Sequence, residues 1–192
     1  MNITELRVCI ASAAAALAER KEEVNRLNVF PVPDGDTGTN MSLTMESVAK
    51  EVKALPMGAD SKALRKAVTH GSLMGARGNS GVITSQILRG LCEGFEGVEE
   101  VDADAIAAAM QRSVAVAFQA VRKPVKGTIL TVLEDSCAAA VAAAQSGATV
   151  HDTLRAIADE SLASVKRTPE FLPVLKENGV VDFGCGTIWR DR

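Results

Sequence analysis

The sequence predicts an all-α protein with about eight helices. Apolar residues recur every three or four positions along almost the whole chain, as in Leu6, Ile10, Ala13 and Leu17. This spacing gathers them on one face of a helix. Alanines cluster in several of these segments and let helices pack closely, and no alternating run of β-branched residues competes with the helical pattern. The fold class expected is therefore a compact helical bundle.

The expected helices follow one another with short connections. The first carries apolar residues from Leu6 to Leu27, and Asn2 with Glu5 resembles a capping box at its start. The second carries apolar residues from Met41 to Leu55 at steps of three and four. Similar patterns predict five more helices, over 61–74, 80–95, 104–121, 128–145 and 149–165. Thr168 and Pro169 are typical of an N-cap and a first helical position, and they predict a last short helix. We find no repeat or flexible linker, so residues 1–192 are expected to form one domain.

Composition excludes several function classes. The chain has 192 residues, a formal net charge of −3 and only 3% aromatic residues, which does not suit a nucleic-acid-binding protein. No apolar run is long enough for a membrane span, and no secretory leader is visible. The four cysteines form no CxxC pair and suit a reducing cytoplasm. With two histidines in the chain, a metal site is expected to use oxygen ligands.

The connection at 28–41 carries the strongest chemical pattern. It reads Asn-Val-Phe-Pro-Val-Pro-Asp-Gly-Asp-Thr-Gly-Thr-Asn-Met and places Asp34 and Asp36 two residues apart, directly before a helix. Paired carboxylates suit Mg²⁺, whose other positions are filled by water and phosphate. The helix start at 37–40 offers backbone N–H groups and a positive dipole end to phosphates. An Asp-Gly turn with a Thr cap is the simpler interpretation, but it explains only one of the two aspartates.

A second connection, Gly-Ala-Arg-Gly-Asn-Ser-Gly at 75–81, leads into another apolar helix. Its glycines predict an anion-binding turn, to which Arg77 adds a cation and Ser80 both a cap and a phosphate donor. An ordinary N-cap explains the same residues equally well. A third helix start, at Gly127 and Thr128 after a lysine, shows a weaker form of the same pattern of glycine and hydroxyl residues. Together the three starts indicate a nucleotide whose phosphates are held through Mg²⁺.

These motifs resemble a known family. Residues 28–41, with Gly-Ala-Arg-Gly-Asn-Ser-Gly-Val-Ile at 75–83, are similar to the DhaL-like ATP-binding domain of bacterial fatty acid kinase, which is related to the L subunit of dihydroxyacetone kinase. Weaker similarities follow at 126–130, 168–175 and 179–182. The resemblance covers nearly the whole chain. It implies an antiparallel, barrel-like bundle of eight helices that holds ATP or ADP and two Mg²⁺ at one end.

The resemblance also implies roles for individual residues. Asp34 and Asp36 would ligate Mg²⁺ and so carry the catalytic role. The residues expected around the nucleotide are Thr37, Gly38, Thr39 and Asn40 at the phosphates, Asn79, Ser80 and Gly81 as a second wall, Gly127 and Thr128 near the nucleoside, and Asp182 and Gly184 near the C-terminus.

Two departures refine this expectation. The dihydroxyacetone kinase pattern has a third aspartate and a histidine after the last one, whereas this chain has Asn28 and Thr37 at those places. Asn28 is therefore the candidate third metal ligand, and the fatty acid kinase branch is favoured. The tail from about 183 is atypical, and the further domains of a fatty acid kinase are absent. We expect the chain to be a fragment of a longer multidomain protein.

The function expected is Mg²⁺-dependent ATP binding within a kinase that phosphorylates the carboxylate of a fatty acid. A separate fatty-acid-binding protein would present that acceptor, and the isolated domain would phosphorylate little. Two alternatives stay open: a dihydroxyacetone-kinase-like phosphotransferase that retains ADP, and a non-catalytic helical module that binds a nucleotide. The sequence does not decide between a monomer and a homodimer.

Overall fold

The computed structural model describes residues 3–182, and within that range it contains eight α-helices and no strand. The all-α prediction is confirmed. The helices are α1 (Ile3–Leu27), α2 (Thr37–Ala54), α3 (Ser61–Gly75), α4 (Gly78–Gly94), α5 (Ala103–Ala120), α6 (Ile129–Gln145), α7 (Val150–Phe171) and α8 (Pro173–Glu177). The tail from 183, which includes the predicted site residue Gly184, lies outside the described residues.

Side-chain caps fix the starts of three helices. Asp60 accepts a hydrogen bond from the Ala63 N–H at the start of α3, at 2.7 Å, and Asp102 accepts one from the Ala105 N–H at the start of α5, at 2.8 Å. At the start of α7, Thr149 Oγ1 accepts a hydrogen bond from the Asp152 N–H, at 3.1 Å. Each cap satisfies a backbone donor that the helix itself leaves free. The N-cap residues of α2 and α4, Asp36 and Arg77, form no such cap, but in α2 the Asn25 side chain of α1 accepts from the Thr39 N–H at 3.0 Å.

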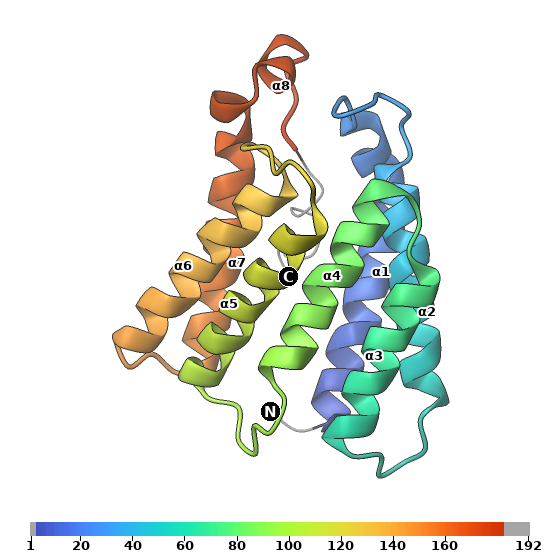
Figure 1. The fold of residues 1–192 in the computed structure, drawn as a ribbon, viewed down its shortest axis with the longest axis vertical. Coiled ribbons are helices and arrows are strands. Elements are labelled where there is room, and N and C mark those ends of the chain that lie inside the picture. Colours follow the sequence, from blue (N-terminus) through green and yellow to red (C-terminus); the bar gives the residue numbers. More distant parts are fainter. Residues whose placement is uncertain (1–2, 183–192) are drawn as a thin grey trace.

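Consecutive helices run antiparallel and pack against one another along the chain (Figure 1). Because the direction alternates, the connections after α1, α3, α5 and α7 all lie at one end of the bundle. Those connections contain the segments 28–36, 76–77 and 121–128, which lie far apart in the sequence. The up-and-down topology therefore brings the three predicted phosphate motifs together at one end.

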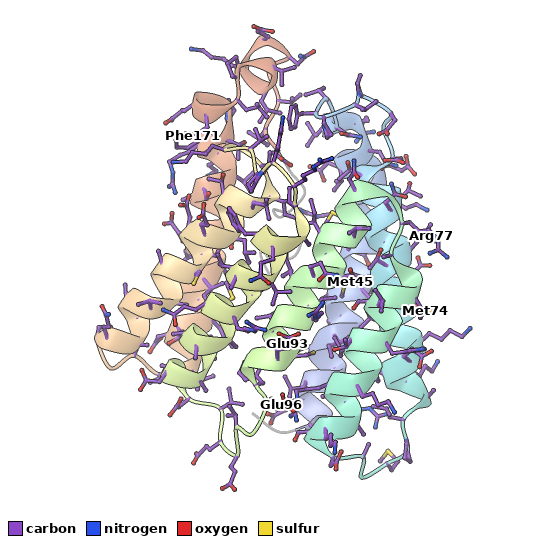
Figure 2. All side chains as sticks on the ribbon, viewed as in Figure 1. Met45, Met74, Arg77, Glu93, Glu96 and Phe171 are labelled. Atoms are coloured by element: carbon purple, nitrogen blue, oxygen red, sulfur yellow. The ribbon has the colours of Figure 1, made fainter. Side chains whose placement is uncertain are left out.

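The core is formed by the inward faces of most helices. Its main cluster includes Leu17 of α1, Met45 of α2, Ala117 of α5, Leu130 of α6 and Ile157 of α7, each less than 9% exposed. Met45 lies inside the bundle in Figure 2. Burial of a leucine, isoleucine or methionine side chain contributes about 1.5–3 kcal/mol. Among residues 3–182, no helix combines the length and the apolar character needed to cross a membrane.

The helix start predicted at Thr168 and Pro169 is wrong. Pro169 lies inside α7, which continues to Phe171, and α8 begins later, at Pro173. A proline inside a helix leaves the carbonyl four residues earlier without its usual donor. Here that carbonyl belongs to Val165, and the Thr168 hydroxyl donates to it at 2.7 Å. The side chain thus replaces the missing backbone donor, and the helix continues.

An ion-pair cluster between α4 and α5 gives the first testable prediction. Arg89 and Arg112 both donate to the Glu93 carboxylate, at 2.7 and 2.8 Å. The hydrogen bond from Arg89, joined by that from Arg112, lowers the pKa of Glu93. Stability from a lowered carboxyl pKa is present at neutral pH and is lost as the pH falls through the folded-state value.

We therefore expect Glu93→Gln to lower the free energy of unfolding by about 1 kcal/mol at pH 7. The deficit relative to the wild type should shrink as urea titrations are repeated toward pH 3, because the wild-type carboxylate then becomes protonated. Glu96→Gln is the matched control, because Glu96 is exposed nearby and forms no ion pair within the described chain. A Glu93→Gln deficit that stayed constant with pH would contradict this explanation.

Candidate functional site

A cavity of about 640 Å³ opens at the end of the bundle where the predicted motifs meet. Its walls come from the loop after α1, the first turns of α2 and α4, and the loop between α5 and α6. This volume is within the range of pockets that bind small ligands and cofactors. The cavity contains eight of the residues predicted from sequence: Asn28, Asp34, Asp36, Thr37, Asn79, Ser80, Thr128 and Asp182.

Asp34 and Asp36 are exposed to solvent at the rim of this cavity. Gly35 between them has a φ of +66°, which favours glycine. The Asn28 amide nitrogen donates to Asp34 Oδ1 at 2.7 Å, which orients that carboxylate. Within residues 3–182, no three His, Cys, Asp or Glu side chains assemble into a metal cluster. Two carboxylates and an amide oxygen fit Mg²⁺, which takes one or two carboxylates and completes its shell with water and phosphate.

The first turns of α2 and α4 lie against each other beside the two aspartates. The Ser80 hydroxyl of α4 donates to the Thr37 carbonyl of α2 at 3.5 Å. Gly81 permits this approach, because a Cβ there would lie 2.6 Å from Thr44 Oγ1 of α2. Free N–H groups and the positive dipole ends of both helices therefore meet at one place. Such an arrangement favours a ligand with several negative charges.

Five predicted residues lie behind the cavity wall rather than on it. Thr39 exchanges two hydrogen bonds of 3.0 Å with the Asn25 side chain of α1. A Cβ at Gly38 would collide with the Lys21 carbonyl of α1, and a Cβ at Gly78 would collide with the Asn40 side chain. Within the described chain, the predicted residues that hold this frame without lining the cavity are Gly38, Thr39, Asn40, Gly81 and Gly127.

The expectations for Arg77 and for a Ser80 cap are wrong. The Arg77 guanidinium donates to the carbonyls of Met74 and Ala76, at 3.3 and 2.8 Å, and points outward at the edge of the molecule (Figure 2). It is not among the described residues that line the cavity. Because α4 begins at Gly78, Ser80 lies inside its first turn and its hydroxyl faces α2 instead of capping the helix.

Sequence reasoning missed the wall formed by residues 120–125. Arg122 and Lys123 line the cavity opposite the motifs, together with apolar side chains such as Val121 and Val125. On α6, Ile129 and Leu130 extend this apolar wall. The basic pair was visible beside Pro124, but the helical pattern placed it just after a helix end and far in sequence from the aspartates. Only the topology shows that the two segments face one cavity.

The chain reaches the cavity once more near its described end. The Asp182 N–H donates to Thr168 Oγ1 at 3.0 Å, and Thr168 is fully buried at the proline of α7. One hydroxyl therefore donates to the Val165 carbonyl and accepts from Asp182. Gly127 packs against the same turn, since a Cβ there would lie 2.9 Å from the Thr168 carbonyl oxygen. Thr168 thus connects α7, the α5–α6 loop and the segment that carries Asp182.

Thr168→Val keeps the volume of this side chain but removes both hydrogen bonds. We expect it to lower the free energy of unfolding by about 1–3 kcal/mol, because a buried carbonyl and an N–H lose their partner. Chemical denaturation measures this loss. Thr168→Ser is the control, since it retains the hydroxyl, and it should recover most of the stability. A Thr168→Val variant as stable as the wild type would contradict this explanation, and a loss confined to Thr168→Ser would assign the stability to the methyl group instead.

Comparison with known proteins agrees with this geometry. Residues 31–189 match the DAK2 domain. Protein YloV of Bacillus subtilis (strain 168) is 49% identical over 175 residues, which cover 91% of this chain and 32% of that protein. An uncharacterized protein of Staphylococcus aureus (strain USA300) is 45% identical over 175 residues, which again cover 91% of this chain and 32% of that protein. The chain thus spans about a third of the length of these relatives. DAK2 domains are kinase-related helical bundles that bind ADP or ATP, and this chain belongs to the DAK2 domain family.

Proposed function

We propose that this domain binds Mg²⁺ and ATP in the cavity and serves as the nucleotide-binding part of a kinase. The proposed acceptor is the carboxylate of a fatty acid, presented by a separate binding protein. One observation carries the proposal: Asp34 and Asp36 lie in the same cavity as the paired first turns of α2 and α4. Metal-binding oxygens beside phosphate-binding helix ends are the two parts that phosphoryl transfer requires.

Each part of the cavity has a defined task in this proposal. Asp34 and Asp36 hold the metal, and Asn28 orients Asp34 through its 2.7 Å hydrogen bond. The first-turn N–H groups of α2 and α4, other than that of Thr39, which donates to Asn25, bind phosphate oxygens, with the hydroxyls of Thr37 and Ser80 beside them. When bound, Mg²⁺ supplies positive charge that offsets the charge of the phosphates. The rate would then come from positioning and electrostatic stabilisation rather than from covalent chemistry.

The proposed acceptor is consistent with the residues on the cavity wall. A fatty acid carboxylate is already ionised at neutral pH and attacks phosphorus without losing a proton, so it needs no general base. No histidine is among the described residues that line the cavity. A hydroxyl acceptor would have to lose a proton to a base during the same step. A carboxylate acceptor is therefore compatible with this wall.

The length of the relatives supports a division of labour. Because this chain matches about a third of each relative, we propose that the acceptor is bound by segments beyond these residues. The domain would then bind the nucleotide by itself and transfer phosphate only as part of the longer protein.

We also propose that the protein is located in the cytoplasm and that it forms a homodimer.

A two-part experiment tests the proposal. Calorimetry of this chain with ATP should show binding that requires Mg²⁺ and disappears in EDTA. The full gene product is then incubated with Mg²⁺, ATP, the fatty-acid-loaded binding protein and hydroxylamine. Since hydroxylamine converts an acyl phosphate to a stable hydroxamate, hydroxamate should accumulate. Binding without any hydroxamate would contradict the acceptor, and no Mg²⁺-dependent binding would contradict the nucleotide site.

The same preparation tests the alternative that family membership favours, a dihydroxyacetone-kinase-like subunit with a permanently bound nucleotide. In that case ADP should remain with the protein through purification and be rephosphorylated by a phosphocarrier protein. Heat denaturation of the purified protein followed by nucleotide chromatography measures retained ADP directly. On the fatty acid kinase proposal, the protein should instead release its nucleotide on dialysis.

A further inference from the structure

We infer that Arg122 and Lys123, in the loop between α5 and α6, form a cationic wall that binds the phosphate chain of the nucleotide. The inference rests on the proposed function, because it concerns the same cavity. Neither residue belongs to the glycine-rich or aspartate-containing motifs. Both line the cavity opposite those motifs, in residues 121–128, which we call the basic loop.

The basic loop is held at both ends, so its position is defined. At its start, the Val121 N–H donates to the Phe118 carbonyl at 3.3 Å and ends α5. At its far end, the Thr128 hydroxyl donates to the Val125 carbonyl at 2.8 Å, and the buried Gly127 N–H donates to Thr131 Oγ1 at 3.0 Å. Pro124 restricts the backbone between these anchors. The two cations therefore extend from a fixed segment.

Within the described residues, the two basic side chains that line the cavity are not paired with its acidic ones. Its acidic residues are Asp34, Asp36 and Asp182, and its basic residues are Arg122 and Lys123. Within residues 3–182, neither Arg122 nor Lys123 forms an ion pair or a side-chain hydrogen bond. Two unpaired cations opposite the aspartates can contact a ligand that is itself anionic. A polyphosphate fits, because the metal can bind it from one wall and the cations from the other.

The position of the two side chains distinguishes them from nearby cations. Lys126 lies in the same loop but is not among the described residues that line the cavity. Arg77, near the start of α4, is directed outward and donates to backbone carbonyls. Loop composition alone therefore does not explain why Arg122 and Lys123 reach the cavity. Lys126 serves as an internal control with the same charge and loop.

The test is calorimetry of the double variant Arg122→Gln/Lys123→Gln with ATP, ADP, AMP and adenosine in excess Mg²⁺. Each lost charge-assisted hydrogen bond costs about tenfold in affinity. We expect ATP to weaken about tenfold to a hundredfold, ADP less and AMP least, with adenosine unchanged. The dependence of ATP affinity on salt should also become shallower, since fewer protein charges meet the phosphates. Lys126→Gln should change none of these values.

Three other outcomes would overturn the inference. These are unchanged ATP affinity in the double variant, an equal loss for ATP and adenosine, and an equal loss in Lys126→Gln. If the double variant binds ATP normally but forms less hydroxamate, the cations act on the acceptor carboxylate and the phosphate assignment is wrong. Failure of the proposed function itself is distinguishable, because the wild-type chain would then show no Mg²⁺-dependent ATP binding. Circular dichroism confirms that each variant is folded.

Discussion

Replacing both Asp34 and Asp36 with asparagine is expected to weaken Mg²⁺-dependent ATP binding by at least about a hundredfold. Asparagine keeps the size and hydrogen-bonding oxygen of each side chain but removes the charge on which a hard cation depends. Because both residues are exposed at the cavity rim, the substitutions should leave the free energy of unfolding almost unchanged. Calorimetry with ATP at fixed free Mg²⁺ measures the loss, and urea denaturation checks the fold.

The matched control is Glu99→Gln/Glu100→Gln, which removes two adjacent acidic charges from the exposed α4–α5 connection. That connection lies at the opposite end of the bundle from the cavity (Figure 1). The control should bind ATP as the wild type does. If the control loses as much affinity as the aspartate variant, net charge explains the result and the metal site is wrong. Normal binding by the aspartate variant would contradict the site directly.

Gly38→Ala should produce the largest combined loss of stability and binding. Its Cβ would collide with the Lys21 carbonyl of α1 and lie 2.9 Å from Val24 Cβ. Neither α1 nor α2 can move without shifting the turn that carries Asp36 and Thr37. Overpacking of this kind costs about 1–3 kcal/mol, and displacement of the turn should reduce ATP affinity at least tenfold. Urea denaturation and calorimetry measure the two effects separately.

Gly90→Ala is the control for this prediction. A Cβ at Gly90 would also collide with backbone, at Ser113 where α4 meets α5, but Gly90 does not line the cavity in the described chain. Gly90→Ala should lower the free energy of unfolding about as much as Gly38→Ala does, while the folded protein binds ATP with wild-type affinity. If Gly38→Ala loses stability but binds ATP normally, the α1–α2 contact supports the fold without positioning the site.

The sequence predicts the bundle well because helical periodicity is a local property. Each apolar stripe forms its own helix, and short connections make neighbours antiparallel. This topology alone brings the loop with Asp34 to the same end as the turn with Ser80. Pro169 was misassigned because propensity favours a helix start there, whereas the Thr168 hydroxyl compensates for the missing donor. That compensation depends on a side-chain rotamer that no sequence pattern shows.

The site was predicted less completely than the fold, for a physical reason. Asp34 and Asp36 carry their chemistry in the side chain, so their spacing is informative. Glycine, however, is required both where a phosphate approaches and where two helices touch. Sequence cannot separate these cases, and the structure assigns Gly38 and Gly81 to helix contacts. Arg122 was missed because its relation to the aspartates is purely tertiary.

The most direct test is a crystal structure of this chain with Mg²⁺ and a non-hydrolysable ATP analogue. We predict a metal bound by Asp34 and Asp36, with phosphate oxygens at the first turns of α2 and α4. A second groove, lined mainly by alanines between α6 and α7, provides an alternative location on the same molecule. A nucleotide bound in that groove, or bound without either aspartate near its metal, would contradict the account.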